Sequence, residues 1–93
     1  NIFGGTAYCG STLEVYPGYT GYLTMYLQRK SSGSWINVTS WSGSTSSLNK
    51  VSLAESYANL ITGTTYRVQA VGRVYQNGIF VEQVSATSPE RTR

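Results

Sequence analysis

Hydrophobic and polar residues alternate with a period of two along almost the whole chain, which is the pattern of half-buried β-strands. Residues 54–60 break this pattern and are compatible with a helical turn, and a Pro-Gly pair at 17–18 predicts a turn. We predict strands over residues 6–16, 22–30, 35–41, 48–53, 64–76 and 79–87. The pattern therefore predicts an all-β fold.

The last two predicted strands form a hairpin. The Asn-Gly pair at residues 77–78 is a strong hairpin signal, because both residue types accept the positive φ of a type I′ turn. A two-residue turn there places Tyr75 opposite Phe80 and, with an unbroken ladder, Arg73 opposite Glu82. We therefore expect an aromatic pair and an ion pair side by side on this hairpin.

A second hairpin is predicted between residues 22 and 41. The polar run at 31–34 closes it and pairs Lys30 with Trp35. An unbroken ladder would then place Thr24 opposite Trp41. In this register the aromatic residues of the hairpin lie on the face opposite its aliphatic residues.

Alternation also predicts the core. The inward positions of the six strands, together with a leucine before the fifth, carry mostly aliphatic side chains. We predict a core of Leu13, Val15, Leu23, Met25, Leu27, Ile36, Val38, Val51, Leu60, Tyr66, Val68, Ala70 and Val74. The single cysteine, Cys9, shares the apolar face of the first strand, so we expect a buried, unreactive thiol. Gly10 beside it predicts a bulge or weak point in that strand.

The segment at residues 60–68 resembles the stretch that leads into strand F of fibronectin type III domains. In that family a Leu, then Gly-Thr, then a Tyr six residues after the Leu form the tyrosine corner. Here Leu60 and Tyr66 hold those positions. The resemblance implies that the Tyr66 hydroxyl bonds back to the main chain and that Leu60 packs beneath its ring.

The order of the predicted strands is similar too. The resemblance implies a two-sheet antiparallel β-sandwich of about six to seven strands, fibronectin type III-like and immunoglobulin-like, in which the six segments are strands B, C, C′, E, F and G. The sequence departs from the family pattern in three ways: Leu13 and Val15 stand where the family carries a Trp, strand A is short or missing, and no Arg-Gly-Asp triplet is present. The chain also resembles small secreted proteins of Gram-positive bacteria with no assigned function.

Length and charge narrow the functional classes. The chain has 93 residues, enough for one domain spanning 1–93, and a formal net charge of +3. Its seven basic residues are spread along the sequence, so we do not expect nucleic acid as a partner. No apolar run approaches the ~20 residues of a membrane-spanning helix, so we expect no membrane insertion. No signal peptide is visible, and because the sequence starts at Asn1 and not at Met, we expect that a preceding segment was removed.

The residue types that carry most catalytic chemistry are scarce. The sequence has no His and one Cys, and its four acidic residues are all Glu. These counts remove the commonest general base and the usual zinc and calcium ligand sets. No phosphate-binding glycine loop is present. We therefore expect no enzyme, no metal and no cofactor.

What remains is an aromatic surface. If the two hairpins share one sheet, as the resemblance implies, the face away from the core carries many aromatic side chains. The predicted binding residues are Tyr22, Tyr26, Trp35, Trp41, Arg73, Tyr75 and Phe80, with Val71, Glu82 and Val84 on the same face. Exposed apolar patches often mark interaction sites. Aromatic pairs between neighbouring strands also stabilise a sheet.

Three functions stay open. The first is a secreted or cell-surface binding or adhesion module whose ligand is a protein surface or a carbohydrate. The second is a structural or self-associating spacer without a ligand. The third is an oligonucleotide binder on an OB-like barrel, which a gathering of Arg29, Lys30, Arg67 and Arg73 beside the aromatic residues would favour. The Ser-, Thr- and Tyr-rich, charge-poor composition favours an extracellular location.

Overall fold

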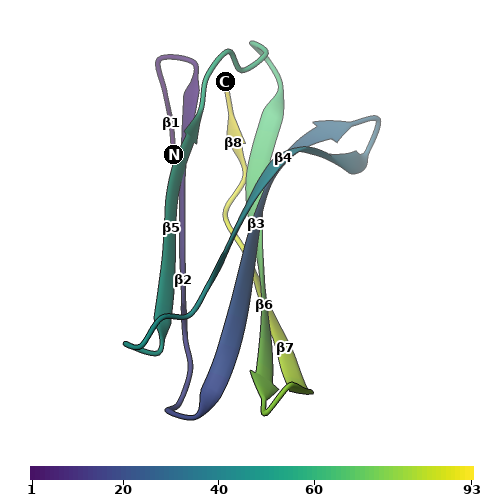
Figure 1. Ribbon diagram of the computed structural model, residues 1–93. Helices are drawn as coiled ribbons and strands as arrows, with labels where there is room; N and C mark the ends of the chain where they lie inside the picture. Colours follow the sequence, from purple (N-terminus) through teal and green to yellow (C-terminus); the bar gives the residue numbers. More distant parts are fainter.

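The computed structural model describes residues 1–93, and all of its regular elements are β-strands (Figure 1). The eight strands are β1 (Ile2–Phe3), β2 (Thr6–Glu14), β3 (Tyr19–Ser31), β4 (Ser34–Ser44), β5 (Lys50–Tyr57), β6 (Thr65–Gln76), β7 (Ile79–Thr87) and β8 (Arg91–Thr92). Each of the six predicted segments contains a strand, but β2 ends at Glu14 and β5 begins at Lys50. The ambiguous segment 54–60 forms no helical turn, because β5 continues through Tyr57.

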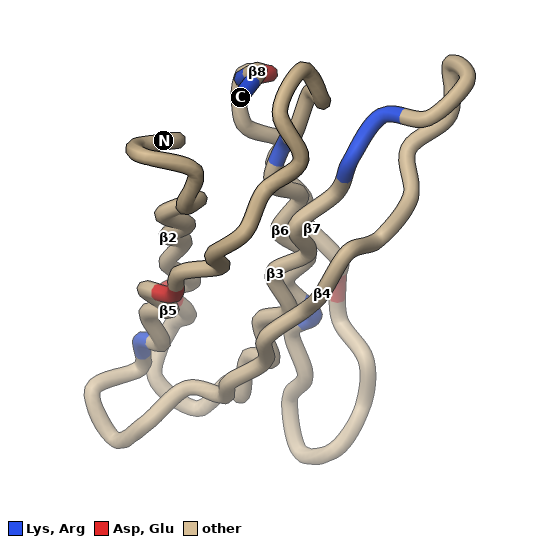
Figure 2. Tube along the Cα trace, turned by 90° about the horizontal axis from the view of Figure 1, so that it is seen from above, with Lys and Arg blue, Asp and Glu red and all other residues tan.

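The strands form two antiparallel sheets. One has the order β1-β2-β5, and the other has the order β4-β3-β6-β7 with β8 paired to β6. Seen from above, the sheets are two separate layers (Figure 2). They do not close into a barrel, so the expectation of an OB-like barrel is wrong.

The predicted turns are present. Asn77 and Gly78 have φ values of 52° and 78°, as a type I′ turn requires. Ser32 and Gly33, with φ values of 51° and 80°, form a second turn of two residues. These turns join β6 to β7 and β3 to β4 and fix where each ladder begins.

The β3–β4 ladder contains a bulge that the sequence did not reveal. Lys30 lies opposite Trp35 as predicted, but the register shifts between Leu27 and Gln28. The extra residue is Val38 in β4. Beyond it Trp41 lies opposite Met25 and packs against the core. The prediction that Trp41 faces outward is therefore wrong, because one extra residue in a ladder reverses the faces of all that follow.

A second bulge lies in the β6–β7 ladder. Tyr75 lies opposite Phe80 as predicted, but the register shifts between Val74 and Tyr75. Beyond the shift Arg73 lies opposite Gln83. The predicted pairing of Arg73 with Glu82 is therefore wrong.

The second bulge also changes the face of β7 on which Glu82 and Val84 lie. Glu82 lies opposite Val74, and Val84 lies opposite Gly72. Since directly opposed residues share a face, Glu82 and Val84 lie on the core side of the sheet. Their predicted placement on the outer side is wrong.

The core lies between the two sheets in two hydrophobic clusters. Most of the predicted core is buried: Leu13, Leu23, Met25, Leu27, Val51, Leu60, Tyr66, Ala70 and Val74. Val15, Val38 and Val68 are half-buried. Ile36 is wrong as a core residue, with 40% of its surface exposed. It faces the core side, but toward its turn the β3–β4 hairpin diverges from the smaller sheet (Figure 1).

The tyrosine corner is present. The Ile61 main-chain N–H donates to the Tyr66 hydroxyl at 2.9 Å, and Leu60 packs in the same cluster as Tyr66. The predicted bulge at Gly10 is absent, since Gly10 pairs with Ala54 in an unbroken β2–β5 ladder.

Candidate binding surface

The outer sheet face is the side of the β4-β3-β6-β7 sheet that points away from β2 and β5. Strand alternation on both sides of each bulge decides which residues reach it. Six of the seven predicted binding residues lie on it: Tyr22, Tyr26, Trp35, Arg73, Tyr75 and Phe80. Trp41 does not.

Three aromatic rings form a contiguous cluster at one end of this face. The Tyr22 and Tyr75 ring centroids are 5.4 Å apart, and those of Tyr75 and Phe80 are 5.6 Å apart, both edge-to-face. Arg73 lies directly opposite Tyr22. We call Tyr22, Tyr75 and Phe80 the aromatic triad.

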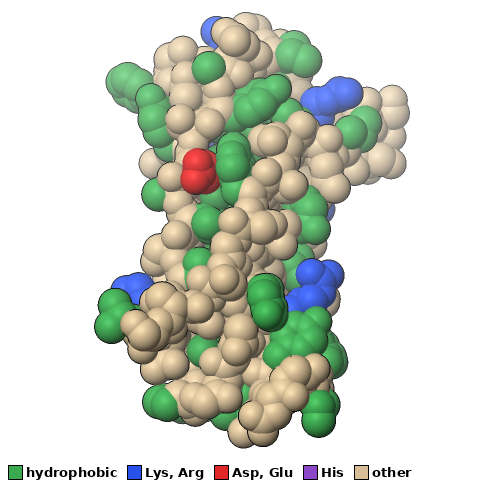
Figure 3. Space-filling view, viewed as in Figure 1, with side chains coloured by type: hydrophobic (Ala, Val, Ile, Leu, Met, Phe, Trp, Pro, Cys, Tyr) green, Lys and Arg blue, Asp and Glu red, His purple; other side chains and the backbone are tan.

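Two rings of the triad are open to solvent, and the central ring, Tyr75, is half-buried. Tyr22 is 50% exposed and Phe80 is 53% exposed. In Figure 3 hydrophobic side chains gather beside a basic residue at the lower right, over the β6–β7 hairpin. An exposed group of rings locked together by edge-to-face contacts offers apolar area with little conformational freedom to lose.

A different cluster surrounds Trp35 near the other end of the face. The Arg67 guanidinium carbon lies 4.2 Å from the centre of the indole ring, and the Lys30 ammonium lies 5.9 Å from it. The Arg67 Nε–H also donates to the Gln28 side-chain oxygen at 2.7 Å. This cation therefore stacks on Trp35 with its position fixed by a hydrogen bond.

Gln28 organises that second cluster, and sequence reasoning missed it. The side chain is buried, and its amide nitrogen donates to Asn37 at 2.9 Å and to Gln69 at 3.3 Å. A glutamine at an outward strand position gives no sign of burial. Its partners come from β4 and β6, which are brought together only by the sheet order.

The two clusters are separate. Tyr22 and Gln28 are six residues apart on β3, which corresponds to about 20 Å along a strand. Between them the face carries Tyr26 and hydroxyl side chains, including Thr24 and Ser42, which are hydrogen-bonded at 3.2 Å. The structure therefore does not bring the predicted aromatic residues into one continuous patch.

The basic residues gather only in part. Arg67 and Lys30 lie at Trp35, and Arg73 lies beside the aromatic triad. Arg29 is opposite Tyr66 and Ile36, on the core side of the sheet.

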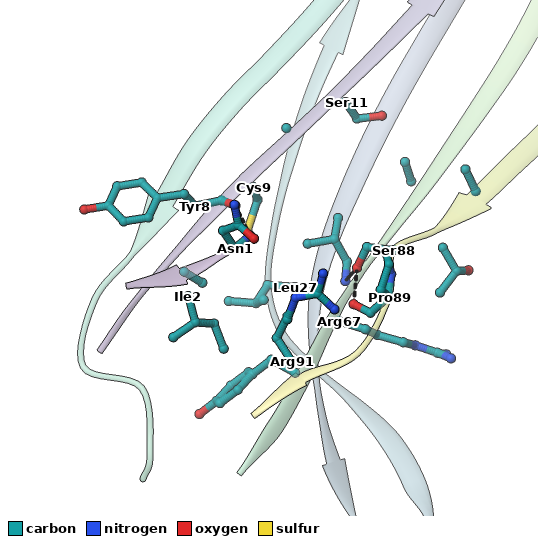
Figure 4. A pocket seen from close by; sticks show the side chains of 17 residues that line it. Asn1, Ile2, Tyr8, Cys9, Ser11, Leu27, Arg67, Ser88, Pro89 and Arg91 are labelled. Atoms are coloured by element: carbon teal, nitrogen blue, oxygen red, sulfur yellow. Dashed lines mark hydrogen bonds between the residues drawn. The ribbon is translucent and has the colours of Figure 1, made fainter. Parts of the chain in front are cut away.

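Two cavities open along the side of the sandwich where β2 and β7 form the sheet edges. The first, about 320 Å³, is lined by β2, β6 and the end of β7, and Cys9, Leu27 and Arg91 lie around it (Figure 4). The second, about 500 Å³, is lined by Val81, Glu82 and Glu14.

The two cavities carry different titratable groups. Glu14 and Glu82 line the same cavity, but both are exposed, whereas the acid of a glycosidase pair is held protonated by an apolar environment. Cys9 is buried, and burial raises the pKa of its thiol, which disfavours the reactive thiolate. No group of three or more His, Cys, Asp or Glu residues lies together.

Comparisons with known proteins add no relative. The structure contains no helix that is long and apolar enough to cross a membrane. No protein-family model matches the chain, and no curated protein or solved structure matches it significantly. The structure shows an all-β protein of two antiparallel sheets.

Proposed function

We propose that this protein is a secreted or cell-surface binding module, without catalytic activity, that binds a protein surface through its outer sheet face. The observation that carries the proposal is the aromatic triad, whose rings are packed against one another while Tyr22 and Phe80 remain open to solvent. Rigid aromatic groups of this kind are the usual hot spots of protein interfaces.

The sheet order supports a fibronectin type III-like sandwich as the framework. In that arrangement strands A, B and E form one sheet and C′, C, F and G form the other. The orders β1-β2-β5 and β4-β3-β6-β7 correspond to it if β1 is a shortened strand A. The tyrosine corner at Tyr66 supports the same assignment. Domains of this class serve many functions, so the framework alone does not select one.

A protein surface fits the geometry better than a carbohydrate. Sugars stack on the open face of an aromatic ring, but the Arg67 guanidinium occupies one face of Trp35. The triad rings meet edge-to-face and so form an uneven surface. Uneven apolar relief beside Arg73 suits the side chains of a partner protein.

Self-association is the second candidate, and β7 is the observation that favours it. Every residue of β7 is exposed, and an exposed edge strand is a template for pairing with another chain. An oligonucleotide is less well supported as a ligand. The basic side chains are divided between two clusters, and Arg29 lies on the other side of the sheet.

The test is a binding panel with a matched pair of variants. Wild-type protein is presented to extracellular proteins, to a glycan array and to a single-stranded oligonucleotide. Phe80→Ser removes one ring of the triad, and Tyr16→Ser removes a ring that is 81% exposed and lines the second cavity instead of the outer sheet face. We expect a protein ligand whose binding Phe80→Ser weakens about tenfold or more, with Tyr16→Ser unchanged. Binding to glycans or oligonucleotide alone, or equal effects of both variants, would refute the proposal.

A further inference from the structure

The smaller sheet has an incomplete edge. β1 pairs with β2 only at Ala7 and Thr6. One further pair of bonds joins Tyr8 to Asn1: the Tyr8 N–H donates to the Asn1 carbonyl at 2.7 Å, and the Asn1 amino group donates to the Tyr8 carbonyl at 3.0 Å. From Cys9 to the end of β2 no strand lies on this side.

This edge carries main-chain groups that only another strand can pair. Since alternate residues of a strand direct their N–H and C=O to the same side, Gly10, Thr12 and Glu14 point theirs in the same direction as Tyr8. The odd residues of β2 bond to β5 instead, as the adjoining bond from the Val15 N–H to the Asn49 carbonyl indicates. An open ladder of this kind is the substrate of strand addition.

A groove runs beside the same edge, between β2 and the core side of β7. Its floor is made by small side chains, Ala7 and Cys9 on β2 and Ala70 and Ala86 on β6 and β7. Leu13 and Val84 both pack at Gly72, where an added Cβ would lie 3.0 Å from Leu13 and 3.2 Å from Val84. Beyond them lie Val81 and Glu82. No strand of the smaller sheet covers β7, so its inward residues remain exposed.

The groove has opposite charges at its two ends. The 17 residues around the first cavity include Arg91 and no acid. The second cavity is lined by Glu14 and Glu82 and by no base. A strand antiparallel to β2 would place its C-terminal end at Arg91 and its N-terminal end at the two glutamates. A peptide with a basic residue first and an acidic residue last would therefore match both ends.

From these observations we propose that the β2 edge is a second binding site, separate from the outer sheet face, which takes an extended peptide segment of a partner protein. The segment pairs antiparallel to β2, inserts small apolar side chains at alternate positions, and carries a basic residue toward its N-terminus and an acidic one toward its C-terminus. The β2 strand of a second copy cannot fill the groove, because its inward side chains are packed in its own core.

The proposal is tested with a synthetic peptide, acetyl-Lys-Thr-Val-Thr-Ala-Thr-Glu-amide, titrated into the folded protein and followed by amide chemical shifts. We expect saturable shifts at Gly10, Thr12 and Glu14 and none at the aromatic triad. The charge-exchanged peptide, acetyl-Glu-Thr-Val-Thr-Ala-Thr-Lys-amide, should bind about tenfold more weakly, since both end contacts become repulsive.

Paired variants test the main-chain ladder. Gly10→Pro removes an N–H that points to the open edge, a position where proline is tolerated. Gly10→Ala keeps that N–H, and its Cβ would lie 3.6 Å from the Leu53 carbonyl, an ordinary contact. We expect Gly10→Pro to weaken peptide binding about tenfold or more relative to Gly10→Ala.

The peptide itself supplies a control that does not depend on the folding of a variant. In the proposed pairing, the main-chain N–H of the central threonine points toward β2, and that of the adjacent alanine points away from it. N-methylation of the threonine should therefore abolish binding, and N-methylation of the alanine should not. Absence of binding by the parent peptide, equal effects of the two methylations, or shifts centred on the outer sheet face would overturn the proposal. So would a dimer formed through the β2 edge that excludes the peptide.

Discussion

The role of a single residue in this protein depends on the face of the sheet on which its side chain lies. Leu27 and Ile36 are both aliphatic, and both were predicted inward from alternation. Leu27 is 1% exposed between the sheets, whereas Ile36 lies where the β3–β4 hairpin has no sheet beneath it. Alternation identifies the face of a side chain, but burial also requires an opposing layer, which the local sequence does not specify.

The first residue-scale prediction follows from this contrast. Leu27→Ala should lower the free energy of unfolding by about 2–5 kcal/mol, since it leaves a cavity in the core. Ile36→Ala should change it by no more than about 0.5 kcal/mol. Urea denaturation of the two variants measures both. Similar losses in both would show that the hairpin end is covered.

The buried thiol of Cys9 should make the free energy of unfolding depend on pH. Burial raises the pKa of its thiol, so above the ordinary thiol pKa of about 8.5 the unfolded chain loses this proton while the folded protein keeps it. The unfolded state then binds fewer protons, and stability falls as pH rises. Between about pH 7.5 and pH 9.5 the free energy of unfolding should fall more for wild type than for Cys9→Ala. Parallel curves would contradict burial of the thiol.

At the scale of elements, most of the fold was predictable and the registers were not. The strand β7, the turn at Asn77 and the tyrosine corner at Tyr66 follow from local sequence signals that depend on few neighbours. The bulges at Val38 and Val81 do not. A bulge adds one residue to one strand, and its position is decided by the packing of partner strands, so alternation within either strand cannot locate it.

The same limit applied to the candidate site. The pair of Tyr75 with Phe80 lies between the turn and the second bulge, so its prediction held. Trp41 lies beyond the first bulge, and its prediction failed. Gln28 was missed because its amide partners on β4 and β6 depend on the three-dimensional order of strands.

The bulge at Val38 makes a prediction about Trp41. Because Trp41 packs against the core but is only half-buried, Trp41→Ala should cost about 2 kcal/mol, less than the ~3–5 kcal/mol of a fully buried ring. Tyr22→Ala, on the outer sheet face, should cost about 0.5–1 kcal/mol through its aromatic contact alone. Thermal unfolding of both variants compares them, and a larger loss for Tyr22→Ala would mean that the β3–β4 ladder has no bulge.

At the scale of the whole molecule, the two sheets differ in size, and that difference produces both proposed sites. The larger sheet presents an outer face with no layer over it, where the aromatic triad stands. It also extends beyond the smaller sheet at β7, where a groove follows the free edge of β2. A binding module with two separate surfaces can engage two partners at once.

The central claim is that the outer sheet face is the primary binding surface. Hydroxyl-radical footprinting tests it most directly, because the reagent oxidises exposed aromatic side chains. The measurement is made on wild-type protein, free and saturated with the ligand that the panel selects. If the ligand covers this face, Tyr22, Tyr75 and Phe80 become protected in the complex, while Tyr16 and Phe3 are oxidised as in the free protein. Unchanged oxidation of the triad in a saturated complex would show that the ligand binds elsewhere.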